Sequence, residues 1–242
     1  MHTVLSACAE VEMIPPFVVA RARELGLGMI AVTDHNSAEN VEAVMQAADG
    51  KDLVVLPGME VQSREEVHLL CLFDDLETVL DWQEYVYAHL PPLRNREEVF
   101  GAQFVMDATG EFVRYNERLL LTSTTMSVEE ITEGVVARHG ICIPAHVDRP
   151  SFSLLTTLGF VPETLDFPAL ELSRHGDVDD ICRRFPSVMG HTFISSGDAH
   201  RLEEMRDGTI LTIASPTIQE IEMALRGQLG RRVRILSGKP TS

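Results

Sequence analysis

Basic residues are scarce in this 242-residue sequence, which has 20 Lys and Arg against 37 Asp and Glu. The resulting formal net charge of −17 argues against a nucleic-acid backbone as the main partner, because phosphate binding requires a basic surface. A local basic pocket can still exist within an acidic surface, and the overall charge suits a protein that holds cations. No apolar run approaches membrane-spanning length, and the first 30 residues do not resemble a secretory signal. We therefore expect a cytoplasmic protein with no membrane partner.

Cysteine is also scarce, and none of the four cysteines belongs to a C-x-x-C pair. This absence excludes a zinc ribbon and a thioredoxin-like redox motif. Cys71 and Cys142 lie in the apolar runs HLLCLF and ICIPA, which predicts that they are buried strand residues. The sequence also lacks repeats and low-complexity tracts, and its apolar fraction of 45% can form a full core.

Strand-like and helix-like segments alternate along most of the chain. Apolar runs such as GMIAVT and ICIPA are separated by segments with helical spacing. Ser127 and Glu130 form a predicted capping box at one helix start, and Ser37 is predicted to cap another helix. About seven such strand–helix units predict a mostly parallel α/β fold, and their number favours a barrel over an open sheet.

Residues 91–126 interrupt this alternation. Within them, FVMDATGEFV predicts a β-hairpin that turns around residues 107–110. The segment is too short to form its own hydrophobic core. We therefore predict a single domain over residues 1–242 that carries an insertion at about 91–126.

Histidines and carboxylates recur at one position, the C-terminal ends of apolar strands. The residues at such ends are His2, His35, Glu60, His146, Asp198 and His200. His68 is an exception, because it begins its strand. The C-terminal ends of parallel strands converge on one face, so these side chains are expected to share a cleft. Imidazole and carboxylate groups are the ligands of zinc, manganese and iron, and cations offset the cost of burying the acids.

Four segments resemble the signature motifs of the PHP (polymerase and histidinol phosphatase) family. They are Thr33-Asp34-His35, Gly58-Met59-Glu60, Ala145-His146 and Ser196-Gly197-Asp198-Ala199-His200. Their ordered set covers the chain from residue 2 to about 215. The resemblance implies a distorted (β/α)7 TIM-like barrel with two or three zinc, manganese or iron ions and phosphoester hydrolysis. It also implies a ligand set with Glu60 as the bridging carboxylate, namely His2, His35, Glu60, His68, His146, Asp198 and His200.

The first motif departs from the family pattern, which is H-x-H-T with two ligating histidines. Met1-His2-Thr3 matches only its last three positions. We therefore expect the first histidine and the first strand to be missing or truncated, and one metal to be bound weakly. Cys8 stands where many members carry another ligand. It either takes that ligand's place as a thiolate or is a small buried thiol.

The expected reaction is the hydrolysis of a phosphomonoester or a short nucleotide. Arg149 is placed to clamp a phosphate, with a surface salt bridge as its other reading. Arg174 follows the strand ALELS, where it either reaches the same site or is a solvated loop charge. Asp34 either orients His35 or a water, or caps a helix. The expected partner is a small phosphorylated substrate. The alternative is a non-catalytic or polymerase-associated PHP module that binds metal and a protein partner, and the sequence does not indicate an oligomeric state.

Overall fold

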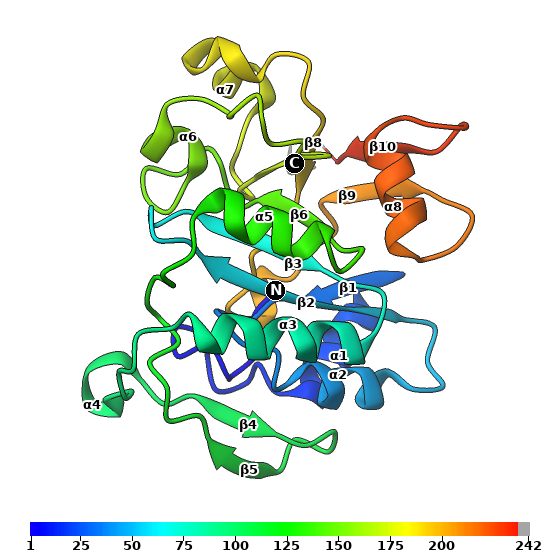
Figure 1. The fold of residues 1–242 in the computed structure, drawn as a ribbon. Helices are drawn as coiled ribbons and strands as arrows, with labels where there is room; N and C mark the ends of the chain where they lie inside the picture. Colours follow the sequence, from blue (N-terminus) through cyan, green and yellow to red (C-terminus); the bar gives the residue numbers. More distant parts are fainter. Residues whose placement is uncertain (237–242) are drawn as a thin grey trace.

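A computed structural model describes residues 1–236, which form a mixed α/β fold (Figure 1). The helices are α1 (Pro15–Glu24), α2 (Val41–Ala48), α3 (Leu76–Ala88), α4 (Glu97–Phe100), α5 (Val128–Val136), α6 (Leu154–Leu158), α7 (Val178–Arg184) and α8 (Ile218–Leu225). The strands are β1 (Met29–Val32), β2 (Val54–Gln62), β3 (His68–Leu72), β4 (Phe104–Met106), β5 (Phe112–Tyr115), β6 (Ile141–Pro144), β7 (Leu170–Leu172), β8 (Phe193–Ser195), β9 (Thr209–Thr212) and β10 (Arg232–Ile235). Two 3-10 helices, η1 (Pro186–Val188) and η2 (Leu202–Glu204), complete the elements. Among the described residues, no helix has both the length and the apolar character that crossing a membrane requires.

The central sheet has four strands in the order β1-β2-β3-β6. β1 and β2 are parallel, whereas β3 runs antiparallel to both β2 and β6. The remaining pairs are β7 with β8, which is parallel, and two antiparallel pairs, β4 with β5 and β9 with β10. The prediction of a mostly parallel arrangement is therefore wrong. Its physical reason is the short 63–67 connection between β2 and β3, because a parallel crossover needs a dozen or more residues.

The strands of residues 1–236 do not close into the predicted (β/α)7 barrel. A cavity of about 740 Å³ lies between the edge of β1 and the strands β8 and β9, and apolar side chains such as Leu70 and Ile194 line it. Along this edge, the amino group of Met1 donates to the Ala31 carbonyl at 3.1 Å, and the Met1 carbonyl accepts the Thr33 N–H at 2.9 Å. These two bonds have the spacing of a parallel ladder, so Met1 pairs with the end of β1.

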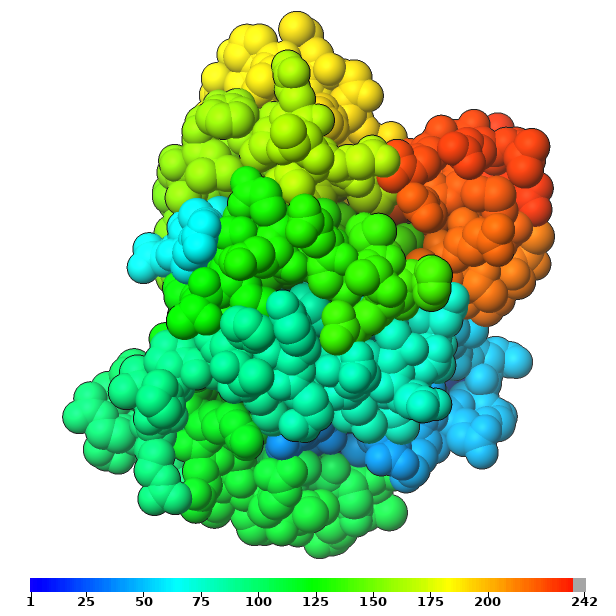
Figure 2. Space-filling view, viewed as in Figure 1, coloured from blue at the N-terminus to red at the C-terminus, as the bar shows by residue number. Residues whose placement is uncertain are grey.

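Helices α3 and α5 lie side by side over one face of the central sheet (Figures 1 and 2). Trp82 of α3 is fully buried, and so is Ile131 of α5. The predicted capping box is confirmed, because the Ser127 hydroxyl accepts the Glu130 N–H at 3.1 Å and the Glu130 carboxylate accepts the Ser127 N–H at 2.7 Å. This box satisfies two amides that the helix cannot pair internally.

The predicted cap at Ser37 is wrong, because α2 begins only at Val41. The Ser37 hydroxyl instead lies 3.2 Å from Gln83 Oε1 and 2.7 Å from the Tyr87 hydroxyl, both of which belong to α3. Ser37 therefore joins the loop after β1 to α3. Sequence spacing alone did not reveal this long-range partner.

The hairpin predicted within residues 91–126 is confirmed as the antiparallel pair β4–β5. Its turn is fixed by Asp107, whose carboxylate accepts the backbone N–H groups of Thr109 at 2.8 Å and Glu111 at 3.0 Å. Asn40 holds the hairpin against the body of the protein, since its side chain donates to the Phe104 carbonyl at 3.0 Å and accepts the β4 N–H of Met106 at 2.9 Å. The hairpin thus packs against the segment that joins β1 to α2.

Replacing Ser127 tests whether its side chain stabilises the start of α5. We expect Ser127→Ala to lower the free energy of unfolding by about 1 kcal/mol, because the Glu130 amide loses its acceptor. Ser187→Ala, at an exposed position in η1, serves as the control and should change stability by less than about 0.5 kcal/mol. Chemical denaturation measures both values, and equal effects would refute the capping role.

Candidate metal centre

Glu60, near the end of β2, lies at the centre of a buried group of imidazoles. One oxygen of its carboxylate is 2.9 Å from His2 Nε2 and 3.7 Å from His35 Nδ1. The other oxygen is 2.9 Å from His68 Nδ1 and 3.2 Å from His146 Nε2. All five side chains are buried. The strand-end residues that the sequence analysis grouped are therefore brought together around one carboxylate.

The antiparallel direction of β3 explains why His68 joins this group from the start of its strand. His68 pairs with Gln62 at the end of β2, and the next residue, Leu69, pairs with Pro144 at the end of β6. The start of an antiparallel strand lies beside the ends of its neighbours. His68 therefore reaches the same edge of the sheet as Glu60 and His146.

Asp198 and His200 complete the cluster from the loop after β8. Asp198 Oδ1 is 3.1 Å from His2 Nε2, and the rings of His2 and His200 stack with centroids 4.1 Å apart. Asp198 has a backbone φ of 43° and His146 a φ of 31°. Such left-handed conformations are unfavourable for residues other than glycine, and they concentrate at functional sites.

Burial and the neighbouring carboxylates shift the pKa values of the cluster's histidines in opposite directions. Burial acts to lower the pKa of His2, but hydrogen bonds to Asp198 and Glu60 outweigh it and raise this pKa to about 9. Burial and the charge on His2 lower the pKa of His200 to about 4. Burial alone would raise the pKa of Glu60, yet the neighbouring imidazoles, with His68 foremost, hold it well below its usual value. Without metal, His2 is therefore protonated at neutral pH, whereas His200 is neutral beside ionised carboxylates. Neutral imidazole and ionised carboxylate are the forms that bind metals.

The donor set fits divalent transition metals. His146 Nδ1 is buried and has no hydrogen-bond partner within residues 1–236, and His146 Nε2 lies only 3.3 Å from His68 Nδ1. A buried ring nitrogen without a partner is unfavourable, and a bound cation would satisfy it. Three groups have ligand atoms within 4.8 Å of one another, namely His2, His35 and His200; His35, Glu60 and His68; and His2, Glu60 and Asp198.

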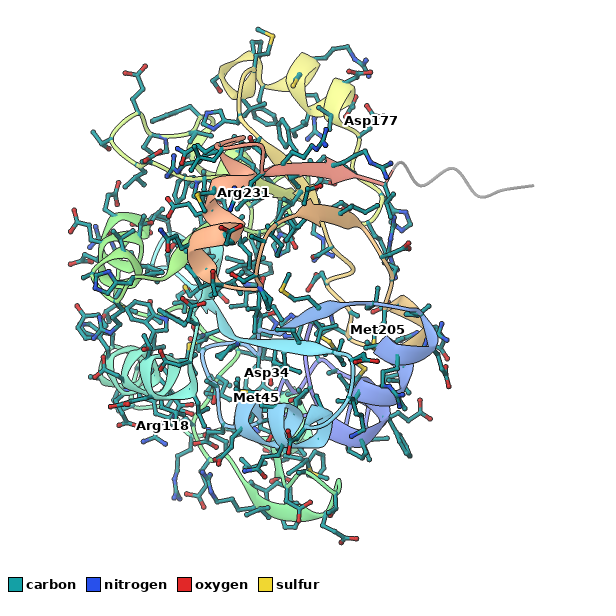
Figure 3. All side chains as sticks on the ribbon, turned by 90° about the vertical axis from the view of Figure 1, so that its right-hand side faces the viewer. Asp34, Met45, Arg118, Asp177, Met205 and Arg231 are labelled. Atoms are coloured by element: carbon teal, nitrogen blue, oxygen red, sulfur yellow. The ribbon has the colours of Figure 1, made fainter. Side chains whose placement is uncertain are left out.

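Asp34 lies in the interior of the molecule, and its backbone carbonyl accepts the Glu60 N–H at 3.1 Å (Figure 3). Its carboxylate accepts the Thr3 N–H at 2.7 Å, the Thr3 hydroxyl at 2.7 Å and the Ser6 hydroxyl at 2.8 Å. The Ser6 oxygen lies 3.0 Å from His2 Nδ1 and accepts the His35 N–H at 3.1 Å. Asp34 thus acts on both histidines through Ser6, and it caps no helix.

Cys8 is exposed as a residue, yet burial raises the pKa of its thiol to about 12, so both readings of Cys8 stay predictions. It lines a pocket of about 240 Å³ that also reaches Asp198 and His200. Arg149 lines this pocket as well, and its Nη1 lies 2.7 Å from Asp198 Oδ2. Arg174 lies in the same wall, where its Nη1 is 3.1 Å from Glu204 Oε1. Both arginines predicted near the site are therefore beside it, each paired with one carboxylate.

Glu171 of β7 is a supporting residue that the sequence analysis missed. Its buried carboxylate accepts the backbone N–H of His146 at 3.0 Å and the hydroxyl of Ser196. It therefore ties together the two strand-end turns that carry His146 and Asp198, and burial raises its own pKa. The available signal was a lone acid within the apolar run ALELS. Phe152 was also missed, and its ring stacks on that of His68 with centroids 4.7 Å apart.

A family model described as "PHP domain" matches residues 1–156. No curated protein is significantly similar to the chain. Among solved structures, the lesion-specific endonuclease EndoQ from Pyrococcus furiosus is 19% identical with a TM-score of 0.68, and the match covers 96% of this chain and 56% of that one. Endonuclease Q has also been solved with a 27-mer duplex that carries an abasic lesion at the active site, and there the TM-score is 0.67 at 19% identity and the same coverage.

A two-domain protein from Bacteroides vulgatus, described as containing a predicted PHP-like metal-dependent phosphoesterase, is 16% identical with a TM-score of 0.54. That match covers 98% of this chain and 62% of that one. An amidohydrolase from Chromobacterium violaceum is 16% identical with a TM-score of 0.54, and its match covers 83% and 86% of the two chains. At these identities the structures show a shared fold. The chain spans a little over half the length of endonuclease Q.

The raised pKa of His2 predicts a pH dependence of stability in chelator-treated protein. The folded-state value of about 9 exceeds the unfolded value of 6.5, so the stabilisation is complete below pH 6.5 and is lost as pH rises through 9. We expect the free energy of unfolding to fall by on the order of 3 kcal/mol across this range. His2→Gln should remove this slope in denaturant titrations at several pH values, and an unchanged slope would contradict the assignment.

Proposed function

The chain belongs to the PHP domain family, and we propose that it is a metal-dependent phosphoesterase that hydrolyses a phosphomonoester or a short nucleotide. The observation that carries the proposal is the position of Glu60, which lies within 3.7 Å of four imidazoles. A buried carboxylate in this setting is suited to bridging cations. We assign the role of metal ligand to His2, His35, Glu60, His68, His146, Asp198 and His200.

Two or three zinc, manganese or iron ions bound to these residues would supply Lewis-acid stabilisation of phosphoryl charge and activate a water. Phosphoryl transfer depends mainly on such positioning and charge stabilisation. The protein's own part is to hold the ligands rigidly. Asp34 fixes the segment with His2 through Thr3 and Ser6, and Glu171 fixes the turn before Asp198.

Arg149 is the group that we propose orients the substrate. Its guanidinium forms an ion pair with Asp198 at 2.7 Å, so it lies beside the cluster. The remaining donors of a guanidinium can take two oxygens of one phosphate in parallel. Cys8 remains a candidate ligand, because it lines the same pocket as Asp198 and His200.

Cleavage of a nucleic-acid strand is the second candidate. The favouring observation is the match of endonuclease Q over 96% of this chain, which corresponds to only 56% of that protein. The net charge of −17 opposes broad contact with DNA, so this candidate requires local binding at the arginine-lined pocket. If the protein hydrolyses neither class of phosphoester, the remaining candidate is a non-catalytic module that binds metal and a protein partner.

Replacing Asp198 tests the catalytic proposal. With manganese supplied, we expect Asp198→Asn to lower kcat/KM for phosphomonoesters by at least ~100-fold, since even residues that only support metal ligands are worth about 10–100-fold. Chelation should abolish the wild-type activity. The control is Asp179→Asn, at an exposed position in α7, which should retain full activity.

The same assay should include a duplex with an abasic site and an undamaged duplex, because these separate strand cleavage from phosphatase activity. Circular dichroism of both variants checks that the fold is intact. Full activity in a folded Asp198→Asn variant would remove this carboxylate from the mechanism.

A further inference from the structure

Two thiols that the proposed hydrolysis does not use lie opposite each other across β3 and β6. Cys71 and Cys142 are partners in the register of this antiparallel pair, and both are free and buried. The prediction that they are buried strand residues is therefore confirmed. The other cysteines lie elsewhere, Cys8 in the turns before α1 and Cys182 in α7. Each thiol of the β3–β6 pair thus has the other as its partner in the sheet.

The two cysteines occupy a position of the strand pair at which side chains approach closely. The Ala145 N–H donates to the His68 carbonyl at 3.0 Å, which makes these two residues a hydrogen-bonded pair. Hydrogen-bonded and non-hydrogen-bonded pairs alternate along antiparallel strands, so Cys71 and Cys142, three positions further along, form a non-hydrogen-bonded pair. The Cα atoms of such a pair are about 4.5 Å apart, just within the range of roughly 4.4–6.8 Å that disulfides span. A disulfide can therefore form here without a shift of either strand.

Both thiols lie between the central sheet and the helices that cover it (Figure 1). Burial and then the neighbouring Cys142 thiol raise the pKa of Cys71 well above its usual value, whereas Trp82 of α3 acts in the opposite direction. The Thr132 hydroxyl of α5 lies 3.6 Å from Cys142 Sγ. A raised pKa leaves little reactive thiolate, so oxidation of this pair requires a local opening of the helices over the sheet.

We propose that Cys71 and Cys142 form a reversible disulfide that joins β3 to β6. Each thiol gives up its hydrogen, and one S–S bond forms between the two sulfur atoms. A molecule of oxidised glutathione accepts both hydrogens, and its own S–S bond breaks to yield two glutathione thiols. The bond is reversible because Cα atoms at the short end of the disulfide range strain it, and strained disulfides are reduced more easily.

The disulfide would join the two strands that hold His68 and His146. His68 begins β3, and His146 follows the end of β6 by two residues. Both imidazoles contact the same oxygen of Glu60, at 2.9 and 3.2 Å. A covalent bond between the strands restricts the unfolded chain and thereby stabilises the fold on which these positions depend. The inference is independent of the proposed function, since it requires no hydrolysis.

Equilibration in glutathione buffers tests the inference on the full chain supplied with manganese. The buffers range from reduced to oxidised glutathione and contain urea below the unfolding transition, so that the buried thiols open transiently. We expect peptide mapping by mass spectrometry to find one disulfide, between Cys71 and Cys142, whose fraction rises with the proportion of oxidised glutathione. The oxidised protein should unfold on heating about 4–8 °C above the reduced protein, as a disulfide of ordinary strength predicts. Cys142→Ala should abolish the bond, and the matched control Cys182→Ala on α7 should retain it.

The disulfides mapped in the wild-type protein decide the outcome even if a variant fails to fold. The site is overturned if Cys71 and Cys142 both stay reduced in the most oxidising buffer. It is also overturned if they bond to Cys8, Cys182 or glutathione as often as to each other. A fraction that does not follow the glutathione ratio overturns the reversibility of the bond. An unchanged or lower unfolding temperature of the oxidised protein overturns the stabilising link between the strands.

Discussion

The burial of Glu60 is the constraint on which the site depends. A carboxylate removed from water is costly unless positive charge and hydrogen bonds compensate it. Here it is ionised and is contacted by nitrogens of His2, His35, His68 and His146 at 2.9 to 3.7 Å. Hydrogen bonds raise the pKa of His2, but burial and the charge on His2 lower the pKa of His35 well below its usual value, so the protein itself compensates the carboxylate only in part. Cations bound here would resolve both problems together, since they would neutralise the carboxylate and be coordinated by imidazoles in their neutral form.

The arrangement around Glu60 is maintained by a further layer of buried acids. Asp34 joins the segment of Thr3 and Ser6 to the end of β1, and Glu171 joins the turns after β6 and β8. These bonds hold His146 in its left-handed backbone conformation and fix the turn that leads to Asp198. Such conformations persist only where surrounding contacts determine them. The supporting acids therefore connect the packing of separate strands to the positions of the ligands.

Much of this site could be predicted from the sequence, because the ligands repeat one topological position. Local signals were also sufficient for the capping box at Ser127 and for the hairpin at residues 107–110. The strand directions could not be predicted in this way, since the reversal at residues 63–67 became evident only through pairing of β3 with β2 and β6. The predicted distorted barrel is not found among residues 1–236, whose strands form one four-stranded sheet and three separate pairs.

Residues that act through distant partners were the hardest to predict. Serine is a residue type favoured at helix N-caps, yet the hydroxyl of Ser37 contacts α3. Glu171 carries no local motif, and its importance follows from two bonds to residues 25 positions away. Contacts of this kind depend on the tertiary fold and leave little trace in spacing or composition.

The most direct test of the account is the transition-metal content of the purified protein after incubation with manganese or zinc, measured by mass spectrometry. The cluster around Glu60 predicts about two to three ions per chain, and Glu60→Gln should remove at least about one of them while the protein stays folded. A wild-type protein that binds no transition metal under these conditions would contradict the central claim.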